Sequence, residues 1–232
     1  MRLLGDIYSD YRRYRATGVA SWAGVLICSR GFWATCCYRI ARAIVLHVHI
    51  PIVRPCLRAG CLLVQLAVEI LTGISLPPEC EIGPGLYIGH FGPVILNSGV
   101  RLGHNCNLSQ GVTVGIAGRG PRRGCPIIGD RVYIGVNAVL IGRIEIGNDA
   151  AIGAGAVVTK SVAACAVVAG NPACVISYKG SFDFVRYDNM DFDPARLEAL
   201  VSSDRLSQDA VAGRRGHNPA IVPERIRALN HL

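Results

Sequence analysis

Between Ile82 and Val158 an aliphatic side chain recurs at every sixth residue, in three runs separated by two irregular steps. An α-helix repeats about every 3.6 residues and a strand every two, so neither produces a sustained period of six. A coil of three short flat faces, with about eighteen residues per turn, does produce it. The pattern therefore predicts a β-solenoid of six-residue repeats. The repeating positions are Ile82, Ile88, Val94, Leu102, Leu108, Val114, Ile128, Ile134, Leu140, Ile146, Ile152 and Val158.

The two irregular steps predict where the coil is interrupted. From Val94 to Leu102 the step is eight residues, which places two extra residues near 98–101. From Val114 to Ile128 the step is fourteen residues, or two repeats plus two. The intervening segment 115–127 (GIAGRGPRRGCPI) is rich in Gly, Pro and Arg, so we expect it to leave the coil as an extruded loop. Loops on rigid scaffolds often carry binding groups.

The flanking segments lack this period and divide the chain into three parts. Residues 1–74 are predicted to be helical, with one helix around 39–45 that ends by Pro51 and a second from about 57 to 72, before Gly73. The solenoid is expected to occupy 75–180. Residues 181–232 form a tail with a short helix at 195–201, and the remainder is expected to be solvated or partly disordered.

Composition fits a packed solenoid and narrows the possible partners. Hydrophobic residues make up 51% of the 232 residues, charged residues only 17%, and 27 glycines suit tight corners. The net charge of +8 suits a nucleic acid, a membrane surface or an anionic cofactor. Before Ser75 there are nine arginines against Asp6, Asp10 and Glu69. Basic runs with interleaved aromatic residues and zinc-finger or helix-turn-helix spacings are missing, so we expect no nucleic-acid partner.

One apolar stretch, 61–71 (CLLVQLAVEIL), bears on membrane contact. Gln65 and Glu69 interrupt it, and it is shorter than the roughly 20 residues that a spanning helix needs. We therefore expect an amphipathic helix that packs on a partner. Peripheral membrane contact through the basic N-terminal region, at the inner membrane, stays open.

The cysteines and histidines show no spacing typical of a disulfide framework or a metal site. There is no CxxC pair, no N-terminal signal peptide of the usual form, and no histidine pair with a supporting carboxylate. We expect reduced thiols in a cytoplasmic protein, and no metal. The cysteines are at 28, 36, 37, 56, 61, 80, 106, 125, 165 and 174.

Several motifs in and around the repeats resemble the hexapeptide-repeat acyltransferases, specifically the serine acetyltransferase-like family. They cover about residues 29–180, and their combination is far more specific than any one of them. The matching segments are Gly31-Phe32-Trp33-Ala34, Tyr38-Arg39-Ile40-Ala41, Thr72-Gly73-Ile74, 110–115 (QGVTVG), 153–158 (GAGAVV) and Gly170-Asn171-Pro172-Ala173.

This resemblance implies a left-handed parallel β-helix of hexapeptide repeats that forms a homotrimer, with a hexamer left open. It implies acetyl-CoA as co-substrate, bound along the coil walls between neighbouring subunits. Small residues allow a close approach to the backbone, and cations can meet the phosphates. The residues expected to contact the cofactor are Gly135, Ala154, Gly155, Lys160, Pro172 and Arg123.

Acetyl transfer to a hydroxyl needs a base for the alcohol proton, and histidine is the natural one near neutral pH. His90 matches the family's catalytic histidine in its position after the lead-in segment, and we expect it to be the general base. His104 is the competing candidate. Glu81, or else Glu79, is the expected carboxylate partner of His90.

The departures from the family pattern concern acids and a loop histidine. Ser75 stands where the family has the aspartate that orients its catalytic histidine, and Gly89 replaces the acid before that histidine. The loop reads 123–126 (RGCP) in place of Asp-Arg-His-Pro. A buried ammonium without an acceptor is costly. The missing acids therefore favour a sugar acceptor held by neutral groups at Asn97, Asn107 and Gln110 over serine.

We therefore predict an acetyl-CoA-dependent O-acetyltransferase that acts on a sugar hydroxyl, in cell-surface or exopolysaccharide synthesis. One alternative is a serine O-acetyltransferase with altered contacts, and another is a non-catalytic hexapeptide scaffold. Direct transfer is favoured over a covalent acetyl-enzyme, for which Cys106 and Cys125 are the remaining candidates.

Overall fold

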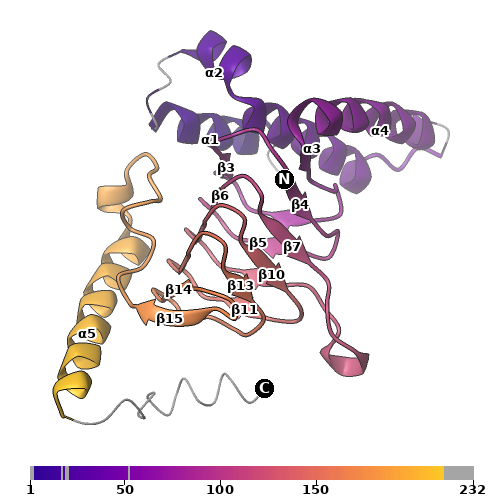
Figure 1. Cartoon of the computed structure of the whole chain (residues 1–232). Helices are drawn as coiled ribbons and strands as arrows, with labels where there is room; N and C mark the ends of the chain where they lie inside the picture. Colours follow the sequence, from indigo (N-terminus) through magenta and orange to yellow (C-terminus); the bar gives the residue numbers. More distant parts are fainter. Residues whose placement is uncertain (1–2, 17, 19–20, 52, 217–232) are drawn as a thin grey trace.

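The structure is a computed structural model that describes residues 3–216, apart from 17, 19, 20 and 52. It consists of a three-sided parallel β-coil with a layer of helices at its first turn and a C-terminal helix along one side (Figure 1). The helices are α1 (Leu3–Ala16), α2 (Trp22–Cys28), α3 (Arg30–His47), α4 (Val53–Thr72) and α5 (Pro194–Gly216), with short 3-10 turns η1 (Gly120–Arg122) and η2 (Met190–Phe192).

Three sheets form the walls of the coil, and successive strands visit them in rotation. The first sheet contains β1 (Ile74–Ser75), β4 (Val94–Leu96), β7 (Thr113–Gly115), β10 (Val139–Ile141) and β13 (Val157–Val158). The second contains β2 (Glu81–Ile82), β5 (Arg101–Leu102), β8 (Ile127–Ile128) and β11 (Glu145–Ile146). The third contains β3 (Tyr87–Ile88), β6 (Asn107–Leu108), β9 (Tyr133–Ile134), β12 (Ala151–Ile152), β14 (Val167–Ala169) and β15 (Cys174–Ser177).

The register confirms the coil that the period of six predicts. Ile134 pairs with Ile152 and Leu140 with Val158, so one turn takes eighteen residues. All twelve repeating aliphatic residues are buried. A second buried series, which the period of six does not single out, lies two residues before most of them: Cys80, Leu86, Val100, Cys106, Val112, Val132, Ala138, Ile144, Ala150 and Ala156.

Both interruptions of the repeat are absorbed at one edge of the coil, between the first and second sheets. The extra residues at 97–100 form a turn in which the Val100 N–H donates to Asn97 O. The step from Val114 to Ile128 proved to be a single face-to-face step with eight added residues, so reading it as two repeats plus two was wrong. The added residues form the expected loop, closed at its base by an antiparallel bridge between Ala117 and Gly124.

The N-terminal region is helical as predicted, but its helices are longer. The first predicted helix is part of α3, and α4 begins four residues before the expected start at 57. Pro55 lies in the first turn of α4, where its missing N–H is tolerated. At 20 residues, α4 is the one helix among the described residues that is long and apolar enough to cross a membrane by length and composition, which is weak evidence alone.

Side chains of the helical layer satisfy the free edge of the first turn. Arg39 is buried and donates to Ile82 O at 2.6 Å and to Gly83 O at 2.7 Å. Its charge is balanced by Asp10, which is also buried, through two hydrogen bonds of 2.9 and 3.0 Å. The hydroxyl of Tyr38 donates to Cys80 O at 2.8 Å and accepts from the Ile82 N–H. These contacts account for the Tyr38-Arg39 pair in the motif.

The C-terminal segment covers the third sheet. Phe184 stacks on Tyr133 with ring centroids 4.6 Å apart, and Ser181 donates to Arg131 O. Arg131 forms a buried ion pair with Asp149 at 2.7 Å. The short helix expected at 195–201 is part of the 23-residue α5, so the chain is helical up to Gly216, where the sequence predicted a solvated or partly disordered tail. Residues 217–232 lie outside the described residues.

Candidate active site

The coil edge between the third and first sheets gathers five of the predicted site residues. Its successive turns, at 89–93, 109–112, 135–138 and 153–156, are stacked by backbone hydrogen bonds such as Asn137 N–H to Gln110 O and Gly155 N–H to Val136 O. We call this column of turns the site edge. It carries His90, Gln110, Gly135, Ala154 and Gly155.

His90 is exposed at the first turn of the site edge. Its ring has no hydrogen-bond partner within the described part of the chain. The neighbouring Phe91 is 62% exposed, and the Arg30 guanidinium lies over its ring at 4.6 Å from the centroid. An exposed imidazole of this kind is available to a ligand and to a second subunit.

Gln110 occupies the turn directly below His90. A Cβ added at Gly92 would lie 3.3 Å from the Gln110 Cβ, which shows how closely the two turns stack. The Oε1 atom of Gln110 is buried, and none of the described residues donates a hydrogen bond to it. Because a buried acceptor without a donor costs free energy, the Gln110 side chain gains a hydrogen bond if it turns toward a donor of a ligand.

Above His90, a carboxylate reaches the position where the family's aspartate is missing. The Ser75 hydroxyl donates to Glu69 Oε1 at 2.9 Å, and the Gln65 amide donates to the same oxygen at 2.9 Å. The Gly92 N–H, in the His90 turn, donates to Thr72 O, three residues after Glu69. The sequence analysis proposed Glu81 or Glu79 and not Glu69, because the turn that brings Glu69 back to Ser75, at Thr72–Gly73, is a feature of the tertiary structure.

Glu81 lies elsewhere in the subunit. It sits on β2 in the second sheet, where its carboxylate pairs with Arg101 at 3.2 Å, and both side chains are exposed. The expectation that Glu81 orients His90 therefore fails within one chain, because β2 and the His90 turn belong to different sides of the coil. His104 lies between the second and third sheets, and its backbone N–H donates to Asp130.

The predicted substrate residues Asn97 and Asn107 are also away from the site edge. Asn107 is buried, accepts from Arg13 and donates to Phe184 O at 2.9 Å, so its amide holds α1 and the C-terminal segment to the coil. Asn97 lies at the opposite edge of the first sheet, where its Oδ1 accepts from the Gly99 N–H and the Cys125 thiol. Both are structural within the subunit, because the amide atoms bonded here serve the chain itself.

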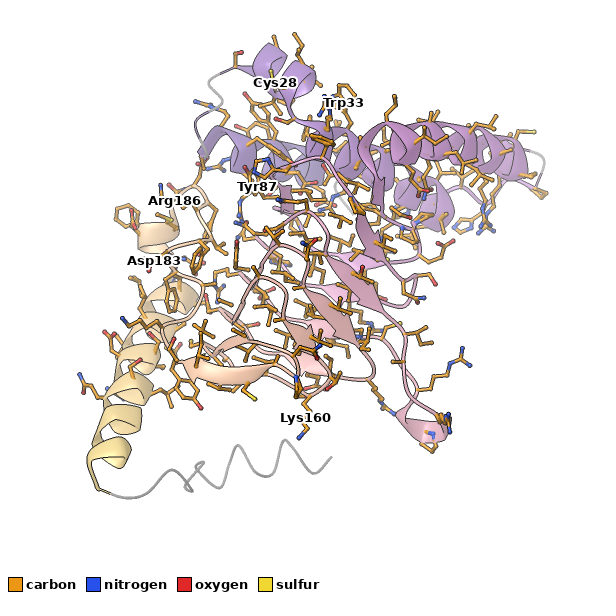
Figure 2. The ribbon with its side chains drawn as sticks, in the orientation of Figure 1. Cys28, Trp33, Tyr87, Lys160, Asp183 and Arg186 are labelled. Atoms are coloured by element: carbon orange, nitrogen blue, oxygen red, sulfur yellow. The ribbon has the colours of Figure 1, made fainter. Side chains whose placement is uncertain are left out.

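The predicted cofactor residues lie in two places. Gly135, Ala154, Gly155 and Pro172 are at or just below the site edge, whereas Lys160 and Arg123 are at the far edge of the first sheet. Gly135 is required for packing, since an added Cβ would lie 2.8 Å from Ala154 N, whereas Gly155, at φ +67°, faces open space. Pro172 follows Gly170, which accepts from the Val157 N–H just below the site edge. Lys160 and Arg123 are exposed at the far edge of the first sheet, and Figure 2 shows Lys160 at the end of the coil away from the helices.

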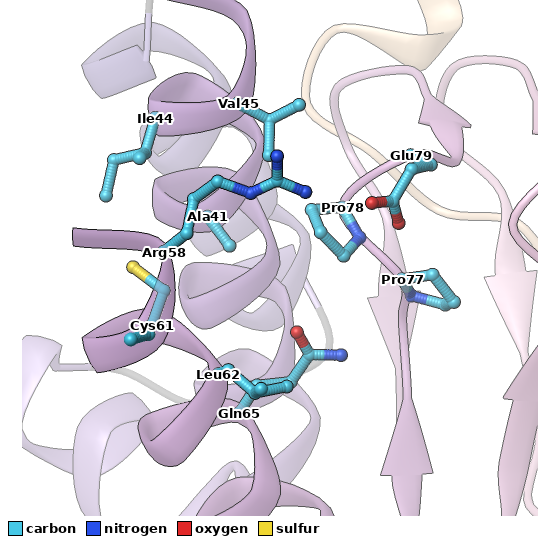
Figure 3. A pocket seen from close by; sticks show the side chains of 11 residues that line it. Ala41, Ile44, Val45, Arg58, Cys61, Leu62, Gln65, Pro77, Pro78 and Glu79 are labelled. Carbon is cyan, nitrogen blue, oxygen red and sulfur yellow. The ribbon is translucent and has the colours of Figure 1, made fainter. Parts of the chain in front are cut away.

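Two hollows in the described structure lie outside the site edge. One, of about 370 Å³, is an apolar pocket between α3, α4 and the Pro77–Glu79 turn (Figure 3). The other, of about 390 Å³, is polar and open on the second sheet, where Arg42, Glu81, Arg101, His104 and Asp130 line it. His90 lines neither of them.

The cysteines give no support to a covalent acetyl-enzyme. Cys106 is fully buried, and burial raises the pKa of its thiol to about 12. Its Sγ donates to Gly129 O. The Cys125 thiol donates a hydrogen bond to Asn97 Oδ1 at the base of the loop. All ten thiols are free, and within the described residues no group of three or more His, Cys, Asp or Glu side chains has metal-binding geometry.

Comparisons with known proteins identify the family. Residues 125–160 match the model of the bacterial transferase hexapeptide (six repeats). The chain is 37% identical over 158 residues to a serine acetyltransferase of Mycobacterium tuberculosis, covering 62% of this chain and 69% of the relative. The chain belongs to the serine acetyltransferase family. It is therefore an acetyl-CoA-dependent O-acetyltransferase, which excludes the scaffold hypothesis.

Solved structures of this family extend the comparison to ligands. The serine acetyltransferase of Neisseria gonorrhoeae in complex with serine superposes with a TM-score of 0.64 and 27% identity, covering 76% of this chain and 69% of the other. A serine acetyltransferase in complex with CoA gives a TM-score of 0.59 and 27% identity, covering 74% and 66%.

The prediction of a sugar acceptor was wrong. The relatives and the structural neighbours are serine acetyltransferases, and the polysaccharide role has no support among them. That prediction rested on the acids missing at Ser75 and Gly89 and on the missing loop histidine, and the structure adds that Glu69 hydrogen-bonds to Ser75.

Proposed function

We propose that this enzyme is a serine O-acetyltransferase that converts L-serine and acetyl-CoA into O-acetylserine and CoA. Besides family membership, the observation that carries the proposal is the unpaired Gln110 Oε1 below His90, together with the Glu69 carboxylate at Ser75. The ammonium of serine needs hydrogen-bond acceptors and negative charge nearby, and these two groups supply them.

In the proposed reaction His90 accepts the proton from the serine hydroxyl as its oxygen bonds to the acetyl carbon. The carbon–sulfur bond of the thioester then breaks, and the departing CoA sulfur receives the proton from His90. Glu69, through the Ser75 hydroxyl, is a positioning residue that replaces the family's lead-in aspartate. A carboxylate near an imidazole favours the protonated ring that forms during transfer.

The site edge is suited to hold the narrow arm of CoA. Stacked strands lie about 4.8 Å apart, so Gly155, three turns below His90, is about 14 Å from it, a distance that an extended pantetheine chain can bridge. Ala154 and Gly155 leave space beside the backbone. Lys160 and Arg123, at the far edge of the first sheet, are cations that a neighbouring subunit would bring to the phosphates.

We also propose a left-handed coil and a homotrimer in which the uncovered first sheet faces a neighbouring subunit. Its outward side chains are uncharged, and Ile95 is 48% exposed, whereas the third sheet is covered by the C-terminal segment and the second carries Glu81, Arg101 and Glu145. Such packing would bring one subunit's site edge near its neighbour's loop.

The proposal is tested by following O-acetylserine by mass spectrometry, because ten free thiols interfere with thiol-based detection of CoA. We expect turnover of L-serine, a loss of kcat of about 10²–10⁴-fold in His90→Ala, and little change in His104→Ala. Gln110→Leu should raise the KM for serine with little effect on that for acetyl-CoA. Absence of serine turnover by a folded, CoA-binding enzyme would overturn the proposal.

The role of Glu69 needs a readout that a purely structural role would not change. Glu69→Gln should lower kcat and leave the KM for acetyl-CoA little changed, because the general base loses the carboxylate that positions it. Ser75→Asp in the Glu69→Gln background should restore activity. A kcat for Glu69→Gln equal to that of the unaltered enzyme, or a failure of Ser75→Asp to restore it, would remove Glu69 from the site.

A further inference from the structure

Helix α4 has its polar side turned toward the protein and its apolar side turned outward. The Gln65 amide donates a hydrogen bond to the Glu69 carboxylate, which also accepts one from the Ser75 hydroxyl. Thr72 is buried and Val68 packs against the core. This arrangement is the reverse of a surface helix in a soluble protein, which directs its apolar stripe to the core.

The outward face of α4 is wide and without charge. At 3.6 residues per turn, the apolar residues of the outward face cover about 220° around the axis of α4. The charged and polar side chains all lie in the remaining sector, toward α3. Leu63 is 68% exposed and Ile70 is 84% exposed. The other exposed members of the face are Val53, Pro55, Cys56, Leu57, Ala59, Gly60, Leu62, Val64, Leu66, Ala67 and Leu71.

The width of this face distinguishes between the possible occupants. A helix that contacts one protein surface buries a stripe of roughly 100°, and a second copy of α4 would leave about half of the arc in water. A lipid phase surrounds whatever is immersed in it and covers the whole arc. Exposed apolar side chains also occur on α2 and α3, where Ile27 is 74% exposed and Ile40 is 45% exposed.

Charge around the face complements an anionic surface. Of the nine arginines in residues 1–74, Arg13 and Arg39 are buried and Arg12 pairs with Asp188; of the three acids, Asp10 is paired with Arg39 and Glu69 is hydrogen-bonded to Ser75. Arg58, on the edge of the apolar arc, is exposed and lines the pocket between α3 and α4 (Figure 3). Arginine side chains at this boundary can reach lipid phosphates while their stems remain in apolar surroundings.

The attachments of α4 favour a helix that lies in the membrane surface over one that crosses it. Its inner side packs along α3, and its last residue, Thr72, is followed after Gly73 by β1 (Figure 1). The hydrogen bonds of Glu69 to Ser75 and Gln65 tie this side to the coil. Crossing the bilayer would break these contacts, whereas surface immersion of the outer arc keeps them.

We propose that the outer face of α4 docks this enzyme on an anionic phospholipid bilayer, with the coil held on the water side. The inference is independent of the acceptor substrate. The sequence pointed only to membrane contact through the basic N-terminal region as a whole. The proposal assigns the attachment to one face of α4 and specifies how the enzyme is oriented on the membrane.

The test is flotation of the full-length enzyme with vesicles of phosphatidylcholine and phosphatidylglycerol at 3:1, compared with phosphatidylcholine alone. We expect binding to the mixed vesicles, weaker binding to the neutral ones, and a loss of about tenfold or more in affinity for the double variant Leu63→Glu/Ile70→Glu. The matched control, Phe192→Glu/Val201→Glu, replaces residues that are 82% and 53% exposed in the C-terminal segment and should bind normally.

Two further measurements keep the proposal falsifiable. CoA binding of Leu63→Glu/Ile70→Glu should match the unaltered enzyme, which shows that the variant is folded, and Arg58→Gln should reduce the preference for phosphatidylglycerol. Failure of the unaltered enzyme to float with either vesicle would overturn the proposal. So would a fall in the mass of the lipid-free assembly in Leu63→Glu/Ile70→Glu, since that result would identify a second copy as the occupant.

Discussion

At the scale of single residues, several motif positions are explained by contacts rather than by chemistry. A Cβ at Gly31 would lie 2.2 Å from Ile88 O, so the glycine of the Gly31–Ala34 motif permits α3 to rest on β3. Gly135, expected at the cofactor, is likewise a packing position. His90 and Gln110 differ from these glycines: the His90 ring is exposed, and Gln110 Oε1 has no hydrogen-bond partner among the described residues.

The thiols provide a test at this scale. Burial raises the pKa values of Cys80 and Cys106 to about 12, so at pH 8 about one thiol in 10⁴ is ionised at each. We expect iodoacetamide to alkylate the exposed Cys28, Cys56 and Cys174 in the native enzyme and to reach Cys80 and Cys106 only after unfolding. Peptide mass spectrometry over time gives the order, and early labelling of Cys106 would contradict the packing described.

At the scale of elements, the helical layer serves as the end cap of the coil. The first turn would otherwise leave backbone groups of β2 and β3 without partners, and Arg39, Tyr38 and Tyr14 satisfy them. Asp10 completes the cap by balancing Arg39 and accepting from the Gly85 and Leu86 N–H groups at 2.9 Å. The cap therefore depends on one buried charge pair.

Breaking that pair should be costly. In Asp10→Asn the Arg39 charge stays buried without its counter-ion, and we expect a loss of about 3–5 kcal/mol in the free energy of unfolding. Urea denaturation followed by circular dichroism measures it. The matched control is Glu81→Gln, which removes the exposed pair with Arg101 and should cost less than about 1 kcal/mol. Equal losses in the two variants would contradict a cap that depends on Asp10.

At the scale of the whole molecule, the three walls of the coil have different surroundings. The third sheet is covered by the C-terminal segment, the second is lined by charges, and the first is uncharged and uncovered. This asymmetry supports a trimer through the first sheet. The cytoplasmic location stays a prediction.

A charge on the first sheet tests this assembly. Ile95→Glu, at a position 48% exposed on the first sheet, should lower the mass of the assembly in analytical ultracentrifugation and reduce acetyl transfer. Ile127→Glu, at a position 45% exposed on the second sheet, should leave both unchanged. The physical reason is that a carboxylate buried at a subunit contact is desolvated without a partner. An unchanged mass for Ile95→Glu would exclude the first sheet as the interface.

The sequence by itself determined the coil, because a period of six leaves an aliphatic side chain facing inward on every wall and each of the twelve positions is buried. It also determined the extruded loop and the helical nature of 1–74. Only the tertiary structure decided which polar residues meet. Rotation around three walls separates Glu81 from the His90 turn, although they are nine positions apart, and the end of α4 brings Glu69 to Ser75. Periodicity specifies which side of the wall a residue faces, whereas proximity depends on the corner it occupies and on what packs there.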